Sequence, residues 1–190
     1  MTKSILLVGV GGQGTILASK LLTIGLMQSG YDVKMSEIHG MSQRGGSVSS
    51  QVRYGEKVQS PVIERGGADI LVSFEKMEAL RWLEYLCPDG KLVVNDYRIN
   101  PMPVVSGLAE YSDKILDELK NKASNVTVVN AFDEAAAIGN PKVLNIVLLG
   151  TIIKMMGLTE IDWNSIIAEE VKADFVKLNQ TALAKGQELV

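Results

Sequence analysis

A short buried strand that runs straight into a glycine-rich turn constrains this fold more than any other feature. Residues 4–9 read SILLVG, and such a mostly apolar run is typical of a central parallel strand covered on both faces. A helix is predicted over residues 13–29, and residues 31–38 (YDVKMSEI) predict a second strand. The order strand, helix, strand favours an α/β fold whose first two strands are parallel and joined by a right-handed crossover.

Two helices differ in their apolar pattern. The helix over residues 13–29 carries a stripe in which Ile16, Leu21 and Ile24 recur at the spacing of one helix face, and we expect this face to be buried. Residues 140–157, NPKVLNIVLLGTIIKMMG, are apolar nearly all round. Such a helix belongs inside the fold or inside an interface.

Strands and helices alternate along the rest of the chain. Residues 47–54, SVSSQVRY, alternate apolar and polar side chains, which predicts a half-exposed strand near an edge of the sheet. Residues 100–107, NPMPVVSG, are interpreted as a proline-rich connector. We expect a doubly wound, Rossmann-like three-layer α/β sandwich with a mostly parallel sheet, formed as one domain over residues 1–190. The other predicted strands cover residues 68–74, 91–96 and 125–130. The other predicted helices cover residues 75–86 and 112–123, and residues 162–190 are expected to form one final helix or two.

Composition excludes several kinds of function. The net charge of −3 gives no electrostatic footprint for nucleic acid or for an anionic membrane, so neither is an expected partner. Cys87 is the only cysteine, so this chain alone cannot hold an iron–sulfur cluster, which needs about four thiolates. A single histidine and a single cysteine also disfavour a zinc site, and no metal site is expected. The low cysteine count favours a reducing, cytoplasmic setting.

The glycine-rich turn has two interpretations. Gly9, Gly11 and Gly14 match G-x-G-x-x-G, a pattern that lets a phosphate approach the N-terminus of the following helix. The same glycines also allow the helix to pack closely on the strand. Glu37 ends the second strand 23 residues after Gly14, as the acid of a dinucleotide site would. Gln13 and the loop after Glu37 depart from that pattern, so an unoccupied or differently occupied Rossmann-like turn is favoured.

Residues 37–48, EIHGMSQRGGSV, form a second loop of unusual composition. His39 is a candidate general base, because imidazole exchanges protons near neutral pH, but with no partner constellation in the sequence a structural role is the alternative. Arg44, followed by Gly45 and Gly46, suits a small anion-binding nest, although glycines and polar side chains also suit a plain structural connection. Both loops are expected at the carboxyl ends of adjacent strands, where open α/β sheets bind ligands. We therefore expect them to share one surface that faces a ligand or a protein partner.

Three stretches of the chain together resemble a known family. They are GVGGQGTILASKLL (residues 9–22), EIHGMSQRGGSVSSQVR (residues 37–53) and ADILVSFEKMEALRWLEYLCPDGKLVVN (residues 68–95). The sequence resembles the gamma subunit or domain of the 2-oxoacid:ferredoxin oxidoreductases. The form HGMSQRGG is most similar to the small, beta subunit of the indolepyruvate-type members.

The resemblance implies a reaction and a division of labour. The reaction is the oxidative decarboxylation of an aryl 2-oxoacid with coenzyme A, which gives acyl-CoA, carbon dioxide and reduced ferredoxin. In that family, thiamine diphosphate, magnesium and the 4Fe–4S clusters belong to the large alpha subunit. The resemblance thus implies an enzyme subunit that holds no cofactor alone, is inactive by itself, and works with the large subunit and ferredoxin.

The resemblance also carries two sets of loop residues over as ligand-facing or partner-facing positions. Whether they contact substrate, coenzyme A or only the partner subunit is left open. Glu75 opens a helix after a buried strand and joins His39 and Arg44 as a candidate catalytic residue, although an acid there also stabilises the helix start, which is the favoured interpretation. The first set is Gly9, Gly11, Gly12, Gln13 and Gly14, and the second is His39, Gly40, Ser42, Gln43, Arg44, Gly45 and Gly46.

Three hypotheses follow from the sequence. The first is the small subunit of an indolepyruvate-type oxidoreductase, docked on its partner through the two glycine loops and the apolar helix of residues 140–157. The second is a free-standing NAD(P)-binding Rossmann dehydrogenase. The third is a non-catalytic docking or coenzyme A-binding module.

Overall fold

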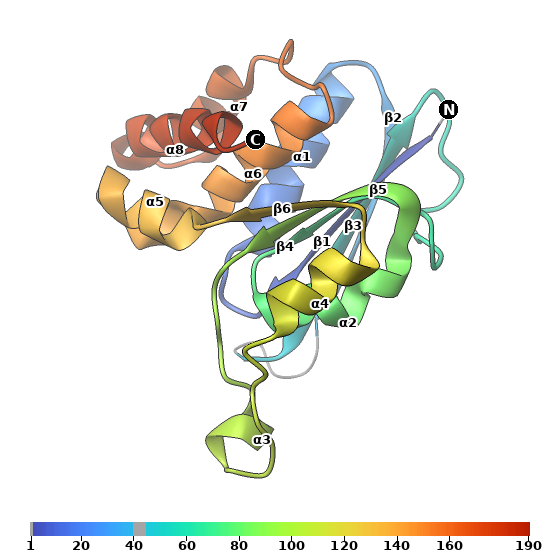
Figure 1. Ribbon diagram of the computed structural model, residues 1–190. Helices are drawn as coiled ribbons and strands as arrows, with labels where there is room; N and C mark the ends of the chain where they lie inside the picture. Colours follow the sequence, from blue (N-terminus) through green and yellow to red (C-terminus); the bar gives the residue numbers. More distant parts are fainter. Residues whose placement is uncertain (1, 40–44) are drawn as a thin grey trace.

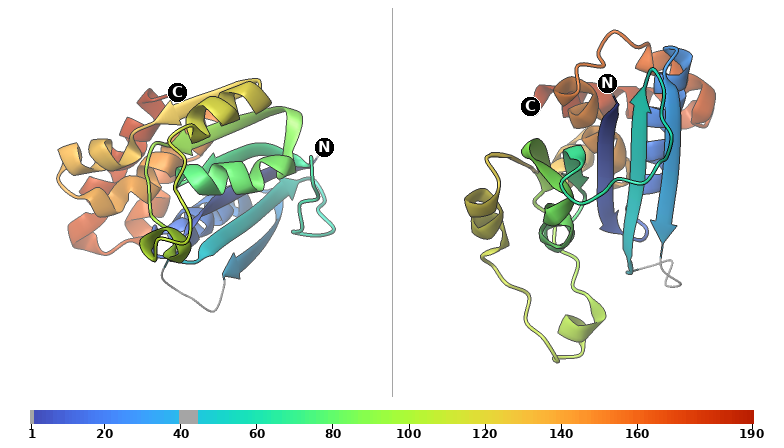
Figure 2. Two further views of the ribbon diagram at one scale, coloured as in Figure 1. Left: turned by 60° about the horizontal axis from the view of Figure 1, so that its bottom comes forward. Right: turned by 90° about the vertical axis from the view of Figure 1, so that its right-hand side faces the viewer.

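A computed structural model describes residues 2–39 and 45–190. In this part of the chain a six-stranded sheet has the order β2-β3-β1-β4-β5-β6, with helices on both faces (Figures 1 and 2). The strands are β1 (Lys3–Val10), β2 (Asp32–His39), β3 (Ser47–Gly55), β4 (Ala68–Ser73), β5 (Leu86–Asn95) and β6 (Asn125–Val129). The helices are α1 (Thr15–Gln28), α2 (Lys76–Trp82), α3 (Met102–Val105), α4 (Ile115–Lys122), α5 (Ala131–Ile138), α6 (Leu144–Met155), α7 (Trp163–Glu170) and α8 (Val176–Glu188).

The sheet is mixed but mostly parallel, which confirms the predicted fold class. Strands β1, β4, β5 and β6 pair in parallel, whereas β3 is antiparallel to both β1 and β2. The expectation that β1 and β2 are neighbours is wrong, because β3 lies between them. Only residues 40–46 separate β2 from β3, and so short a connection joins antiparallel strands rather than parallel ones.

Strand β3 is buried rather than half-exposed at an edge, so that prediction is also wrong. Its side chains do alternate, but the polar side is covered by the segment of residues 56–67 and by α2. Gln51 accepts a hydrogen bond from the backbone N–H of Ile63 at 2.6 Å, and Ser47 donates to the carboxylate of Glu78. A polar residue in a strand can therefore mark a covering segment with hydrogen-bonding groups instead of solvent.

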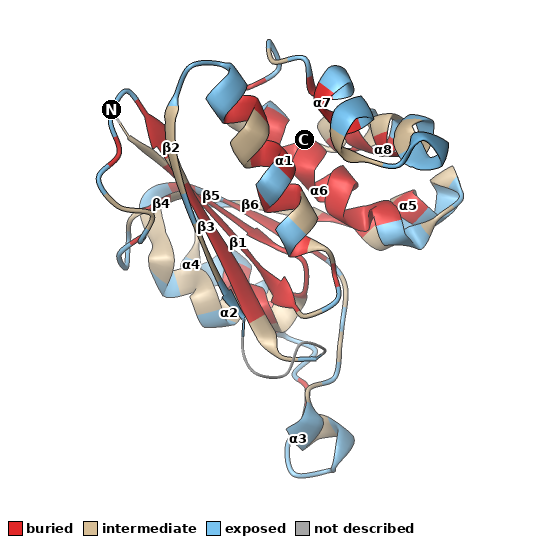
Figure 3. Ribbon diagram, turned by 180° about the vertical axis from the view of Figure 1, so that it is seen from behind, coloured by how far each residue is buried: buried red, intermediate tan, exposed pale blue. Residues whose placement is uncertain are grey.

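The two faces of the sheet carry separate cores. Alternate side chains of β1 point to opposite faces, so Ile5 packs with α1 and α6 while Leu6 packs with α2 and α4. The helices α1, α5, α6, α7 and α8 form the thicker layer, and α2 with α4 form the thinner one (Figures 1 and 3). The sheet therefore has a helical layer on each side, as a three-layer sandwich requires.

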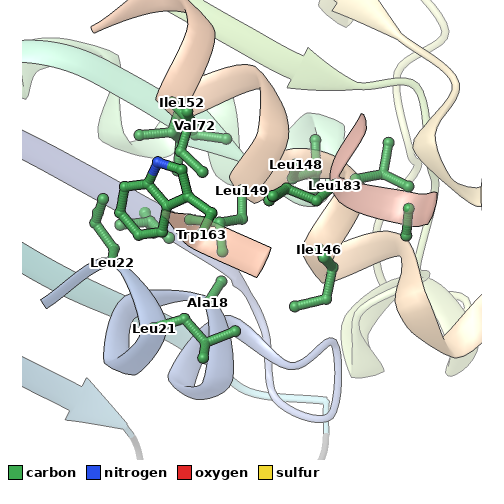
Figure 4. Close-up of a cluster of buried hydrophobic side chains, with 14 of the residues drawn as sticks. Ala18, Leu21, Leu22, Val72, Ile146, Leu148, Leu149, Ile152, Trp163 and Leu183 are labelled. Carbon is green, nitrogen blue, oxygen red and sulfur yellow. The ribbon is translucent and has the colours of Figure 1, made fainter. Parts of the chain in front are cut away.

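The buried face of α1 differs from the predicted stripe. Leu21 of the stripe is fully buried, but Ile16 is 53% exposed, and the packed face also includes small residues beside its leucines. Gly25 makes room for the ring of Trp163, because a Cβ at Gly25 would lie 2.3 Å from a ring carbon. Trp163 belongs to the buried cluster that also contains Leu21 and Leu22 (Figure 4). The prediction followed bulky residues and missed small ones that permit close approach. The buried residues of α1 are Thr15, Ala18, Ser19, Leu21, Leu22, Gly25 and Leu26.

The apolar helix of residues 140–157 lies inside the fold. Asn140 accepts a hydrogen bond from the N–H of Lys142 at 3.0 Å, and a 3₁₀ turn, Pro141–Val143, leads into α6. Residues 144–153 of α6 are all buried, as the red colouring of Figure 3 shows. A Cβ at Gly186 of α8 would lie 1.9 Å from the carbonyl oxygen of Val147, so the two helix backbones touch. The prediction that this helix offers a docking surface is therefore wrong.

Three further local features differ from the sequence analysis. The helix predicted over residues 75–86 ends at Trp82 and is followed by a 3₁₀ turn, Leu83–Tyr85, because Leu86 already belongs to β5. Helix α5 was not predicted. The proline-rich connector contains α3 and projects away from the body of the molecule (Figures 1 and 2).

Within residues 2–39 and 45–190, no helix has the length and apolarity to span a bilayer.

Candidate functional site at the carboxyl edge of the sheet

The two glycine loops meet at one edge of the sheet. The backbone N–H of Gly11 donates to the carbonyl of Gly46 at 2.8 Å, and the N–H of Gly45 donates to the carbonyl of Gly11 at 3.4 Å. Strand β3 brings them together, because it begins beside the last residues of both β1 and β2. The candidates Gly40, Ser42, Gln43 and Arg44 lie outside the described residues.

Gln13 and Gly9 shape the first loop from within. The buried Gln13 side chain accepts a hydrogen bond from the N–H of Val10 at 2.8 Å and donates to the carbonyl of Phe74 at 2.9 Å. A Cβ at Gly9 would lie 2.9 Å from the Cβ of Phe74. Both residues thus fasten the turn to the end of β4. The side chain of Gln13 therefore links the end of β1 to the end of β4.

Gly12 and Gly14 form the outward part of the turn. Both have positive φ, +103° and +81°, a region that only glycine adopts routinely. The space beside Gly12 is open, whereas a Cβ at Gly14 would lie 2.7 Å from the amide nitrogen of Asn145. Gly14 caps α1 without a side-chain hydrogen bond, and the first turn of α1 contains no acid. The turn therefore presents backbone N–H groups and the positive end of the helix dipole to an approaching anion.

Two pockets flank this turn and share Gly11, Gly12 and Gly14. The first, which we name the aromatic pocket, has a volume of about 480 Å³ and is also lined by Tyr97, Phe132 and Lys142 among others. The rings of Tyr97 and Phe132 stack with centroids 4.9 Å apart. The second, which we name the His39 pocket, has a volume of about 430 Å³ and also includes Thr15, Ile16, His39 and Val48.

Glu37 does not occupy the position of a dinucleotide-binding acid. Its carboxylate accepts a hydrogen bond from the hydroxyl of Ser19 at 2.9 Å, which ties the end of β2 to α1. Glu37 lines neither pocket beside the glycine turn. His39, by contrast, lies at the end of β2 and does line one of them.

Glu75 is buried and caps a helix, as the favoured interpretation expects. Its carboxylate accepts from the N–H groups of Met77 at 2.7 Å and Glu78 at 3.1 Å, the first turn of α2. The other oxygen accepts from the N–H of Ile99 at 3.2 Å and from the hydroxyl of Tyr111. Burial and the Glu75 carboxylate raise the pKa of Tyr111 well above its usual value. All these donors point inward, so Glu75 organises structure at this edge.

Glu78 is a buried acid that the sequence interpretation missed. Its carboxylate accepts from the hydroxyl of Ser47, to which the indole N–H of Trp82 also donates at 3.4 Å, and the guanidinium of Arg81 lies 3.4 Å away. Burial raises the pKa of Glu78. The sequence did offer a signal for Glu78, because it lies one helical turn after Glu75, the acid that caps the same helix. Glu78 and Glu75 line a cavity of about 30 Å³ beside Gly45.

Across the described ranges, no three His, Cys, Asp or Glu side chains come together in a way that would hold a metal ion. Cys87 is half-buried at the start of β5, and a lone thiol does not fit an iron–sulfur cluster.

The chain is similar to known proteins over almost its whole length. Residues 4–189 match the pyruvate ferredoxin/flavodoxin oxidoreductase family. A relative from Archaeoglobus fulgidus, indolepyruvate oxidoreductase subunit IorB, is 36% identical over 192 residues, which cover 98% of this chain and 94% of the relative.

Solved structures share the fold. Pyruvate oxidoreductase subunit PORC from Thermotoga maritima is 22% identical, with a TM-score of 0.75 and coverage of 98% of this chain and 96% of that one. The 2-oxoglutarate:ferredoxin oxidoreductase from Magnetococcus marinus, solved with 2-oxoglutarate, coenzyme A and succinyl-CoA bound, gives a TM-score of 0.75 at 15% identity. It matches 99% of this chain but only 31% of its own length. The resemblance seen in the two loops is confirmed: the chain belongs to the pyruvate ferredoxin/flavodoxin oxidoreductase family.

Proposed function

We propose that this chain is the small subunit of an indolepyruvate-type 2-oxoacid:ferredoxin oxidoreductase, with residues 1–190 acting as one gamma-type domain. The observation that carries this proposal is the 36% identity, across 98% of the chain and 94% of the relative, to an indolepyruvate oxidoreductase subunit. An alignment of this length includes both glycine loops and the elements between them. The complex would convert an aryl 2-oxoacid and coenzyme A to acyl-CoA and carbon dioxide, and pass electrons to ferredoxin.

The residues of this chain support a division of labour. An iron–sulfur cluster needs about four thiolates and this chain has one cysteine, so its residues do not fit a cluster. In the proposal, thiamine diphosphate with magnesium and the clusters reside on a large alpha subunit, where they supply decarboxylation and electron transfer. The small subunit then contributes binding surface and positioning.

The glycine turn and the aromatic pocket suit coenzyme A. The uncapped N-terminus of α1 offers N–H donors for a phosphate, and Lys142 adds a cation at the same pocket. The stacked rings of Tyr97 and Phe132 offer a surface for a flat purine. A volume of about 480 Å³ lies in the usual range for small-molecule sites. Coenzyme A is bound in the solved Magnetococcus marinus enzyme, which shares this fold.

The dehydrogenase alternative is less favoured. A nicotinamide dinucleotide site requires an acid that is free to bind the ribose, and Glu37 is engaged by Ser19 instead. The docking or coenzyme A-binding module remains compatible with the pockets, and it differs from the first hypothesis in predicting no role in turnover.

The test is kinetic and uses the co-expressed complex of this chain with the large subunit. Indolepyruvate, coenzyme A and ferredoxin should support turnover, and Gly12→Ala should raise the KM for coenzyme A about tenfold, because alanine is strained at positive φ and its methyl group enters the open space beside the turn. Gly30→Ala is the matched control, since Gly30 also has positive φ and open surroundings but lies at the far end of α1. Equal KM values in both variants would contradict the assignment of coenzyme A to this turn.

A further inference from the structure

An arm with an apolar tip projects from the edge of the sheet that carries the glycine loops. The arm is the segment of residues 98–111 and contains α3 (Figures 1 and 2). At its tip, Met102 is 74% exposed, Val105 is 65% exposed and Leu108 is 84% exposed. The tip sequence over residues 101–109, PMPVVSGLA, contains no charged residue.

The root of the arm is fixed by the buried Glu75. Its carboxylate holds the N–H of Ile99 on one branch and the hydroxyl of Tyr111 on the other. The guanidinium of Arg98 lies 4.3 Å from the centre of the Tyr111 ring, and its Nε donates to Asn100 at 2.7 Å. Both branches of the arm therefore leave the body in a defined direction.

The tip is also preformed. The N–H groups of Leu108 and Ala109 donate to the carbonyl of Pro103 at 2.8 Å and 3.1 Å, and the N–H of Ser106 donates to the carbonyl of Met102 at 2.9 Å. These bonds close the tip into a compact turn whose large apolar side chains face outward. Contiguous exposed apolar groups on a soluble protein mark an interaction surface more often than chance.

The arm is continuous with the candidate site. Tyr97 and Ile99, at its root, line the aromatic pocket together with the glycine turn. Ile99 and Pro101 line the small cavity that also includes Gly45. Any protein that brings redox groups to this pocket must approach the same edge, and it would meet the arm.

We propose that the arm tip inserts into an apolar groove of the large partner subunit. This inference rests on the proposed function, since it needs a large subunit that completes the site. In the Magnetococcus marinus enzyme, this fold accounts for 31% of a longer chain, so there the fold is joined to a much larger remainder.

The experiment measures the affinity of this chain for the large subunit by biolayer interferometry, with both subunits from the co-expressed complex. Val105→Asp should weaken binding at least about tenfold, because a charge would enter an apolar groove. The matched control is Val62→Asp, since Val62 is 60% exposed but belongs to the segment of residues 56–67, away from the arm. Both variants should melt at the temperature of the wild-type chain, because both side chains lie outside the core.

The other outcomes of this experiment overturn either the arm proposal alone or the proposed function with it. Wild-type affinity for Val105→Asp, or equal losses in both variants, would overturn the arm proposal while leaving the small-subunit assignment intact. Dimers of the isolated chain that Val105→Asp dissolves, seen by analytical ultracentrifugation, would reassign the tip to a second copy. Failure of the wild-type chain to bind the large subunit would overturn the proposed function and the arm proposal together.

Discussion

Helix α6 and the arm make opposite use of apolar residues. The ten residues 144–153 of α6 are all buried, between the sheet and α8, whereas the three large apolar side chains at the arm tip are more than half exposed. The sequence patterns placed α6 either inside the fold or at an interface, and they made the arm a simple connector. The difference teaches that apolar content alone does not identify an interface, because burial depends on what the rest of the chain places opposite.

The largest expected effect comes from Trp163, the first residue of α7 in the thicker helical layer that also contains α6. Trp163 is buried against Gly25 of α1 and donates its indole N–H to the carbonyl of Leu158 at 2.8 Å. Trp163→Ala should lower the free energy of unfolding by about 3–5 kcal/mol, since it leaves a large cavity. Urea denaturation measures this, with Trp82→Ala as the control. Because Trp82 is only half-buried on the thin layer, an equal loss there would contradict the asymmetry of the two layers.

A direct comparison of α6 with the arm should give the next largest effect. Ile152→Ala removes a fully buried side chain of α6 and should cost about 2–5 kcal/mol of unfolding free energy. Leu108→Ala, at the 84% exposed position of the arm, should change that free energy by less than about 0.5 kcal/mol. If the two substitutions cost the same in urea denaturation, the arm packs in solution on its own chain.

The smallest expected effect concerns pH and the buried Glu78. Burial raises its pKa in the folded state, so between pH 4.5, its ordinary value, and the raised folded pKa the folded chain binds more protons than the unfolded chain. Stability from this group is therefore present below that window and is lost as pH rises through it. Glu78→Gln should flatten this decline, and urea titrations at several pH values measure it. An unchanged slope in the variant would contradict the assignment to Glu78.

Local signals in the sequence predicted much of the fold. The strand β1, the glycine turn and the helix α1 follow from adjacent residues, and so do β4, β6 and the capped entry to α6. The insertion of β3 beside β1 was not predictable in the same way, because strand order depends on contacts between distant segments. The buried face of α1 was predicted only in part: Leu21 lies on it as expected, but Ala18 and Gly25 were missed because they pack through their small size.

The sequence predicted which loop residues belong to the candidate site better than it predicted what each of them does there. The resemblance named Gly9 and Gln13 among the loop residues, but the structure turns both inward, onto Phe74 and the end of β4. Tyr97 and Phe132 were not singled out, since they come from segments far from the glycine turn in sequence. Their stacking beside the turn depends on the parallel pairing of β5 with β6, which brings the ends of those strands together.

The central claim is that this chain supplies a binding surface while its partner carries the redox chemistry. The most direct test compares indolepyruvate-dependent reduction of ferredoxin by the isolated chain with that by the complex with the large subunit, at equal concentrations and with coenzyme A present. We predict turnover by the complex and none by the isolated chain. Turnover by the isolated chain alone would contradict the account.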